Sequence, residues 1–377
     1  MIPMAWHSPI PQSGRQSRTG TAVWLGLVAG MVLLVAGAGC RSSSSGAPHF
    51  DPRATTAQPL TNLVEVGFTN TLNPEWLEPS RKPYRLGPGD EIDIEILGES
   101  DGPTETFVGP DGRIYFQLIP GLQVWGLSLE EARELIEERA AEYVREPQVA
   151  ITLREVRSKR VWVLGRVSTP GLYPLRAPMT IIEAITLAGG LFTSRFSGTT
   201  EELADLHHSF VIRDGSMLPV HFHELLREGD TSQNIYLEPD DFIYLPSSLS
   251  SEIYVLGAVN FPRAVAFKDQ VSLVSAVAHA RGPLKDAWLG HVAIVRGSLT
   301  EPRIAIVDYD AIVKGRAPNV RLEAHDIVYV PFAPYRSLKN YANLIVNTFV
   351  RTIAANEGGR AANPDYSKPG VSIPISQ

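Results

Sequence analysis

Apolar and polar residues alternate with a period of two directly after a tight turn near residue 90. In the stretch YRLGPGDEIDIEI, glycine and proline at 87–89 break regular structure, and Ile92, Ile94 and Ile96 then alternate with acidic residues. Side chains two apart along a strand share one face. The pattern therefore predicts a turn followed by a strand with one buried apolar face and one acidic face.

The same unit continues with a second strand, a helix and a third strand. A Pro-Asp-Gly turn precedes a strand over 113–119, which is expected to stop at the Pro-Gly pair at 120–121. Ser128 and Glu131 form a capping box for the helix in SLEEARELIEERAAEYV, whose apolar residues share one face. The strand QVAITLREV closes the unit. Residues 84–157 are thus predicted to form a small α+β domain.

Two segments repeat one pattern at a shift of 92 residues. VWVLGRVSTPGLYPL, from Val161, aligns with IYVLGAVNFPRAVAF, from Ile253. The register persists through a short helix, with a hydroxyl cap and a terminal glycine, to the matching ends DDFIYLP and HDIVYVP. The second copy is seven residues shorter between the helix and the final strand. We therefore predict two tandem β-rich modules with one helix each, at 158–248 and 249–335.

The C-terminal segment predicts an amphipathic helix. SLKNYANLIVNTFVRTIAANE contains neither Gly nor Pro, so we predict a helix over 336–357 and a disordered tail over 358–377. At 1.5 Å per residue such a helix is about 32 Å long, close to the hydrocarbon thickness of a membrane. Its apolar face carries Leu338, Tyr341, Leu344, Ile345 and Phe349, and its polar face carries Asn340, Asn343, Asn347 and Arg351.

The N-terminus has the pattern of an export signal, predicted over 1–39. Two arginines precede an apolar run over 21–38, and small residues then lead to Cys40, the single cysteine of the chain. This ending resembles a bacterial lipoprotein signal, in which the cysteine takes a thioether-linked lipid. Two alternatives stay open: the run is an uncut membrane anchor, or Cys40 is an incidental thiol near a conventional cleavage site. Residues 40–83 are polar and contain proline, which predicts a flexible tether.

Composition and motifs narrow the function classes. The 377 residues are 44% hydrophobic and 20% charged, and the formal net charge of −7 argues against nucleic acid as a partner. The sequence has no nucleophile elbow, phosphate loop or metal-ligand motif, so we expect no cofactor and no enzymatic activity. Three acid pairs fit solvated strand and turn faces better than the two carboxylates of a glycosidase. These pairs are Asp240 with Asp241, Asp308 with Asp310, and Glu91 with Asp93.

Histidines and tryptophans offer weaker candidates. The histidines at 207–208 could approach His221 and His223 across a hairpin. A zinc site needs a third or fourth ligand and an ordered second shell, so we interpret them as surface loop histidines and predict no metal site. Trp125, Trp162 and Trp288 could stack on sugar rings, but core packing or subunit contact is the preferred role.

Taken together, these motifs resemble a known family. YRLGPGDEIDIEI, GPDGRIYF and the capped helix resemble the polysaccharide biosynthesis/export domain, and the two VLG-x-V-x-x-P copies resemble soluble ligand-binding β-grasp (SLBB) modules. With the lipoprotein signal and the terminal helix, the chain resembles the outer-membrane polysaccharide export lipoproteins of the Wza type. The resemblance implies an α+β fold: a small export domain, two tandem β-grasp-like domains and a C-terminal amphipathic helix.

The resemblance also implies a function and partners. Members of that family form rings, octameric by resemblance, that conduct capsular or extracellular polysaccharide across the periplasm and outer membrane. Their terminal helices close into a barrel, which would place the four polar helix residues toward the pore and the five apolar ones toward lipid. The implied location is the outer membrane, lipid-anchored and facing the periplasm, and the implied partner is an inner-membrane polysaccharide co-polymerase. The alternative is a lipid-anchored periplasmic glycan-binding or adaptor protein without a pore, which packing of the helix on its own domains would favour.

Overall fold

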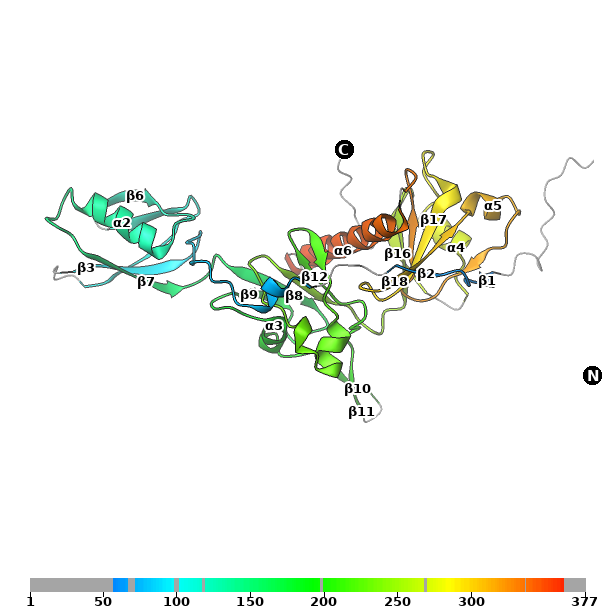
Figure 1. Cartoon of the computed structure of the whole chain (residues 1–377), viewed down its shortest axis with the longest axis horizontal. Helices are drawn as coiled ribbons and strands as arrows, with labels where there is room; N and C mark the ends of the chain where they lie inside the picture. The colour runs from blue at the N-terminus through cyan, green and yellow to red at the C-terminus, as the bar shows by residue number, and fades with distance from the viewer. Residues whose placement is uncertain are drawn as a thin grey trace, which may run out of the picture. The chain divides into compact units, whose positions relative to one another are not determined.

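The computed structural model describes residues 57–66, 72–97, 102–116, 119–196, 199–267, 270–335 and 337–362. The predicted signal peptide at 1–39 and Cys40 lie outside the described residues, as does the end of the predicted tail from residue 363. The described part has the predicted α+β character, with an export domain, two β-rich modules and a C-terminal helix (Figure 1).

The predicted alternating strand is β3 (Glu91–Ile96), the central strand of a three-stranded antiparallel sheet in the export domain. Its neighbours are β4 (Thr104–Phe107) and β7 (Val149–Glu155). The isoleucines of β3 are buried against helix α2 (Leu129–Ala140), and the predicted capping box of Ser128 and Glu131 is confirmed. The acidic face of β3 is partly exposed and meets arginines, with Asp93 near Arg154.

The predicted stop at residues 120–121 is wrong. Strand β5 (Arg113–Phe116) pairs instead with β6 (Ile119–Gln123), which contains the proline and the glycine. The pair forms its own two-stranded sheet. In a two-stranded sheet every strand is an edge strand, and an edge strand can hold a proline because the missing N–H is not needed by a second neighbour.

The turn before β3 is organised by a buried carboxylate. Asp90 is fully buried and accepts hydrogen bonds from the backbone N–H of Gly87, at 2.8 Å, and of Ser158, at 2.8 Å. It also accepts from the hydroxyl groups of Tyr84, at 2.6 Å, and of Ser158, at 2.9 Å. A Cβ at Gly87 would lie 2.6 Å from the Cβ of Ser158, so only glycine lets the turn approach this closely. The GPGD stretch therefore ties the start of the export domain to its end.

Each predicted β-rich module contains a mixed sheet. Within the described residues, one α-helix packs on the first sheet, but two pack on the second, α4 (Leu273–His279) and α5 (Tyr309–Val313), so the prediction of one helix is wrong for the second module. The first sheet has the order β13-β12-β14-β8-β9, with a parallel contact between β8 and β14, and its helix is α3. The bounds are β8 (Arg160–Gly165), β9 (Gly171–Pro174), α3 (Ile181–Leu187), β12 (Phe210–Arg213), β13 (Ser216–Leu218) and β14 (Phe242–Leu245). A hairpin of β10 (Thr193–Phe196) and β11 (Thr199–Glu202) and a short helix η2 (Glu224–Glu228) extend this module.

The second sheet has the order β16-β15-β20-β17-β18-β2, in which β2 is Val64–Glu65, and again one parallel contact, between β15 and β20. The bounds are β15 (Glu252–Gly257), β16 (Arg263–Ala266), α4 (Leu273–His279), β17 (Val292–Gly297), β18 (Pro302–Val307), α5 (Tyr309–Val313) and β20 (Ile327–Val330). Gly165 and Gly257 end the equivalent strands β8 and β15. A Cβ there would lie 2.0 Å from the carbonyl oxygen of Leu245 and 2.1 Å from that of Val330, which explains the repeated VLG motif.

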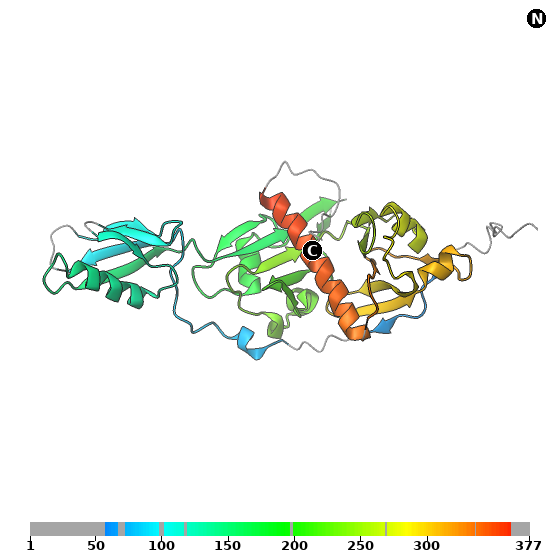
Figure 2. The same cartoon turned by 90° about the horizontal axis from the view of Figure 1, so that it is seen from above.

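Helix α6 (Leu338–Ala362) packs on both modules and runs past residue 357, where the sequence pattern places its end. Figure 2 shows the helix lying across both modules. Its buried side chains include Tyr341, Ile345 and Phe349, and they share one apolar cluster with residues from both sheets. That cluster includes Ile212 of β12 and Val295 of β17. Within the described residues, no helix combines the length and the apolar character needed to cross a bilayer.

The described part of the predicted tether contacts both modules. Strand β2 (Val64–Glu65) pairs with β18, and β1 (Gln58–Pro59) pairs with β19 (Val320–Arg321). Further along, the short helix η1 (Pro74–Leu77) packs Trp76 on the core of the first module. Pairing through the backbone at a sheet edge needs few apolar side chains, so a polar composition did not reveal it.

Candidate functional site

The two modules share a buried ion pair at equivalent positions. Arg213 of β12 donates from Nε and Nη2 to Asp241, at 2.9 and 2.6 Å, and Arg296 of β17 does the same to Asp326, at 2.8 Å in both bonds. Both carboxylates are fully buried, and each also accepts a backbone N–H three residues upstream. Ion pairs of this kind fix the sheet of each module, and the carboxylates are engaged in structural bonds.

The acids of the three pairs considered from the sequence differ in burial and in bonding partners. Asp241 is buried and ion-paired, so its prediction as part of a solvated face is wrong. Its partner Asp240 is exposed, as expected. Asp308 caps α5, Asp310 bonds Lys314 and Arg316, and Glu91 lies 2.9 Å from Arg157. In none of these three pairs is an acid shown to be arranged toward a second carboxylate for bond cleavage.

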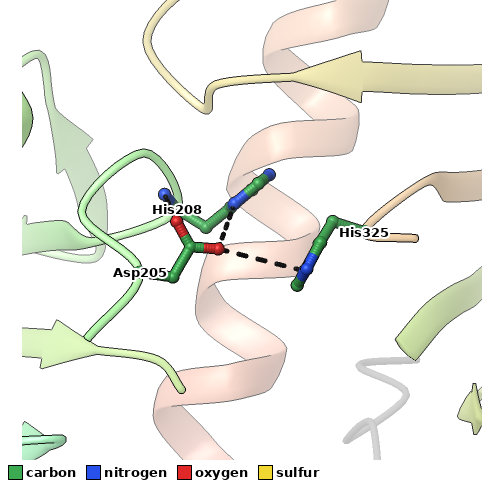
Figure 3. Close-up of side chains that lie close together, drawn as sticks. All are labelled: Asp205, His208 and His325. Atoms are coloured by element: carbon green, nitrogen blue, oxygen red, sulfur yellow. Dashed lines mark hydrogen bonds and ion pairs between the residues drawn. The ribbon is translucent and has the colours of Figure 1, made fainter. Parts of the chain in front are cut away.

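Histidines gather where the first module meets the second. His208 Nδ1 lies 2.6 Å from Asp205 Oδ2, and His325 Nδ1, from the turn before β20, lies 4.0 Å from the same oxygen (Figure 3). The rings of His208 and His325 are stacked, with centroids 4.7 Å apart and planes 22° apart. Within the described residues this is the one group of three potential metal ligands that lie within 4.8 Å of one another.

Burial and neighbouring charge set the protonation of this cluster. Burial lowers the pKa of His325, the nearby His208 ring lowers it further, and Asp205 and Glu252 oppose the shift. Burial alone would raise the pKa of Asp205, but the hydrogen bond from His208 and the charges of both histidines hold it below its usual value. The lowered pKa of Asp205 favours its carboxylate form, and the lowered pKa of His325 disfavours protonation of that ring.

A polar cavity of about 280 Å³ lies beside this cluster and is lined by both modules. His207 and His223 stack across it with centroids 4.5 Å apart, so the predicted approach of the two histidine pairs is confirmed. His221 Nδ1 lies 3.1 Å from the hydroxyl oxygen of Thr300 in the second module. The lining residues are Leu206, His207, Ser209, Val220, His221, Phe222, His223, Glu224, Glu228, Ser298, Thr300 and Glu301.

Asp205 and His325 were not predicted from the sequence as members of the cluster. His325 lies in the second module, far along the chain from His208, and hairpin reasoning joins only neighbouring strands. No local sequence pattern marks His325, and its unusual feature is a backbone angle that only the structure shows. His325 occupies a position with φ of +68°, a left-handed conformation that non-glycine residues other than Asn, Asp and His seldom adopt.

The predicted pore-facing residues of α6 have different surroundings. Asn347 accepts from the backbone N–H of Met217 at 3.2 Å, and Arg351 donates to the carbonyl oxygen of Gly215 at 2.6 Å. Asn340 is exposed and Asn343 is half-buried. These contacts are with the hairpin of β12 and β13, so two of the four polar side chains meet the first module in this structure.

The predicted membrane-facing residues meet protein in this structure. Tyr341, Ile345 and Phe349 are 3%, 0% and 6% exposed and pack on the two modules. Leu338 is half-buried, and Leu344 is 52% exposed. Contact of this face with lipid stays a prediction, and it would require the helix to leave the modules.

The tryptophans occupy different surroundings. Trp162 packs beside the cluster beneath α6, and Trp288 contacts the ring of His291 with centroids 4.4 Å apart. Trp125 is 59% exposed, so core packing is wrong for it. Phe107 and Tyr115 of the same domain are also exposed, at 61% and 64%. The export domain therefore presents aromatic side chains that its own core does not use.

Comparison with known proteins places these domains. A family model described as "Polysaccharide biosynthesis/export protein" matches residues 78–154, and a model described as "SLBB domain" matches residues 159–245 and 251–330. Similar proteins include the EPS I polysaccharide export outer membrane protein EpsA of Ralstonia nicotianae. It is 27% identical over 301 residues, which cover 72% of this chain and 77% of EpsA. The polysialic acid transport protein KpsD of Escherichia coli is 22% identical over 252 residues, which cover 57% of this chain and 43% of KpsD.

Proposed function

The chain belongs to the polysaccharide biosynthesis/export proteins with SLBB domains, as its motifs predicted, and we propose that it exports a capsular or extracellular polysaccharide at the outer membrane. The observation that carries this proposal is the order of domains in one chain. An export domain is followed by two SLBB modules, and the match extends over most of the length of a relative named for polysaccharide export. Family and relatives are export proteins, so the chain is not an enzyme.

We propose further that the protein acts as a ring of its own copies around the polymer. The exposed aromatic side chains of the export domain support this, because Phe107, Tyr115 and Trp125 offer apolar surface for a neighbouring subunit or for sugar rings. Tyr115 and Trp125 both point away from the core of the hairpin that holds Ile114 and Val124. A ring would receive its polymer from an inner-membrane polysaccharide co-polymerase.

Electron microscopy of the full-length protein extracted in detergent tests the ring. We expect particles with a central hole, and we expect a strain that lacks the protein to lose its surface polysaccharide. Single copies in detergent, together with lost export in the deletion strain, would contradict the ring and retain the export role. Normal export in the deletion strain would contradict the proposed function itself.

Lipid attachment at Cys40 is the proposed mode of anchoring to the outer membrane. Cys40 follows an apolar run and small residues, and it is the only thiol of the chain. We expect the Cys40→Ser variant to lose a metabolically incorporated fatty acid and to leave the outer-membrane fraction, because a hydroxyl cannot form the thioether. Unchanged labelling of the variant would contradict the anchor, and Ser42→Ala, two residues away, is the matched control.

A second candidate is an anchored periplasmic adaptor that holds a glycan or a partner protein without forming a pore. The observation that favours it is the burial of α6 on its own modules, where Tyr341, Ile345 and Phe349 fill an apolar cluster. In this candidate, the helix braces the SLBB modules and the export step is performed by other proteins. Single copies in the microscope combined with retained binding to oligosaccharides of the host polymer would select it.

A further inference from the structure

The cluster of Asp205, His208 and His325 has one oriented oxygen at its centre. The other carboxylate oxygen, Asp205 Oδ1, accepts the backbone N–H groups of His207 at 3.1 Å and of His208 at 3.3 Å. These two bonds fix the carboxylate and direct Oδ2 toward the two imidazole rings. A carboxylate oriented by backbone groups in this way is the kind of support that protein metal ligands have.

One ring nitrogen of the cluster is not used by any protein group that the structure describes. Within the part of the chain that the structure describes, the buried Nε2 of His208 has no hydrogen-bond partner. Its other ring nitrogen is already used by Asp205. The nitrogen belongs to a ring that stacks on a second histidine and bonds a carboxylate, and no group of the described residues uses it, so it is available to a ligand.

The internal repeat allows Asp205 and His325 to be compared with the equivalent residues of the other module. Asp240 is the equivalent of His325 and has nearly the same backbone, with φ of +69° against +68°. Trp288 is the equivalent of Asp205. The backbone N–H of Trp288 donates to the carbonyl oxygen of Pro331 at 2.8 Å, and that of Asp205 donates to the carbonyl oxygen of Pro246 at 2.9 Å. Each proline follows the closing strand of its module. At the junction, the turn of the second module carries His325, and the first module carries Asp205 and His208 at the surface that contacts this turn. The equivalent positions Asp240 and Trp288 carry other residues, whereas His208 recurs as His291.

We propose that Asp205, His208 and His325 bind a divalent metal ion of the zinc class and that the ion joins the two SLBB modules. Two imidazoles and one carboxylate form the nitrogen and oxygen set that Zn²⁺ takes in three-ligand sites, with a water in the fourth position. Hard cations such as Mg²⁺ prefer oxygen ligands only and do not fit. The stacked rings do not point their lone pairs at one point, so binding includes rotation of an imidazole ring.

The ion would act as a cross-link between domains. Two ligands come from the loop before β12 in the first module, and one comes from the turn before β20 in the second. Occupation would therefore fix the junction between the modules without changing either core. This role does not depend on the proposed export function, because it concerns the junction within one chain.

Titration of the metal-free full-length protein in detergent with Zn²⁺ tests the site. We expect one ion per chain at low micromolar zinc, and a rise in melting temperature because the ion binds only the folded state. The His325→Asn variant keeps a residue that tolerates the left-handed turn but loses the ligand nitrogen. It should bind zinc about 100-fold more weakly, since even the loss of a supporting residue costs 10–100-fold. Mg²⁺ should produce neither effect.

Matched variants separate this cluster from its neighbours. His279→Asn changes an exposed histidine on α4, and His223→Asn changes a histidine of the adjacent cavity. Both should bind zinc as the unchanged protein does, and Asp205→Asn should lose affinity as His325→Asn does. Absence of zinc binding, equal affinity in His325→Asn, or a loss confined to His223→Asn would each overturn the proposal. Equal melting temperatures of the variants without zinc show that they are folded.

Discussion

The Asp241→Ala variant is expected to lose about 3–5 kcal/mol of unfolding free energy, because it leaves the buried guanidinium of Arg213 without its carboxylate. Asp241 is fully buried and accepts two bonds from Arg213 and one from the backbone N–H of Glu238. Nε of Arg213 and the N–H of Glu238 lose their acceptor, whereas Nη2 of Arg213 keeps the carbonyl oxygen of Tyr236, at 2.8 Å. Arg213 is itself 8% exposed and lies 5.5 Å from the ring centre of Trp76, so water has little access to replace the carboxylate.

The matched control for this prediction is Glu238→Ala. Glu238 also pairs with Arg213, at 3.4 Å, but its side chain is 52% exposed, and pairs of this kind contribute about 1 kcal/mol or less. Denaturant unfolding of the two variants, followed by the fluorescence of the tryptophans, gives the comparison. Equal losses would show that solvent reaches the pair and that burial does not decide its contribution.

This pair also shows what the sequence could and could not predict. The alternation of Ile92, Ile94 and Ile96 predicted β3 correctly, because a period of two is a local property of one strand. Asp241 was assigned to a solvated face because its partner lies on another strand, 28 residues earlier. A usable signal existed in the repeat. Arg213 and Asp241 recur as Arg296 and Asp326, and an arginine and an acid retained in both copies indicate an internal pair.

The cluster of Asp205, His208 and His325 and the docked N-terminal segment could not be predicted, for the same reason. His208 and His325 meet only because two complete modules pack together, and no pattern within either module fixes that packing. Strand β2 joins the second sheet through its backbone, and such pairing requires no particular amino-acid composition. Local periodicity and capping therefore predicted the elements and the repeat, whereas the contacts between modules required the structure.

The largest effect expected from a change in α6 follows from Ile345. Its side chain is fully buried in the cluster shared by both modules, so Ile345→Ala is expected to cost about 2–5 kcal/mol of unfolding free energy. The neighbouring Leu344 is 52% exposed, and Leu344→Ala should cost about 0.5 kcal/mol or less. Thermal unfolding of the full-length variants in detergent measures the difference.

The comparison of Ile345 with Leu344 also separates the two candidate functions. If α6 stays docked on the modules in the assembled protein, only Ile345→Ala destabilises it, and the helix serves as a brace. If the helix leaves the modules to enter lipid, the side chains of both residues contact hydrocarbon. The two variants should then have the same melting temperature. Equal melting would contradict the docked helix and support the membrane-facing role predicted for this face.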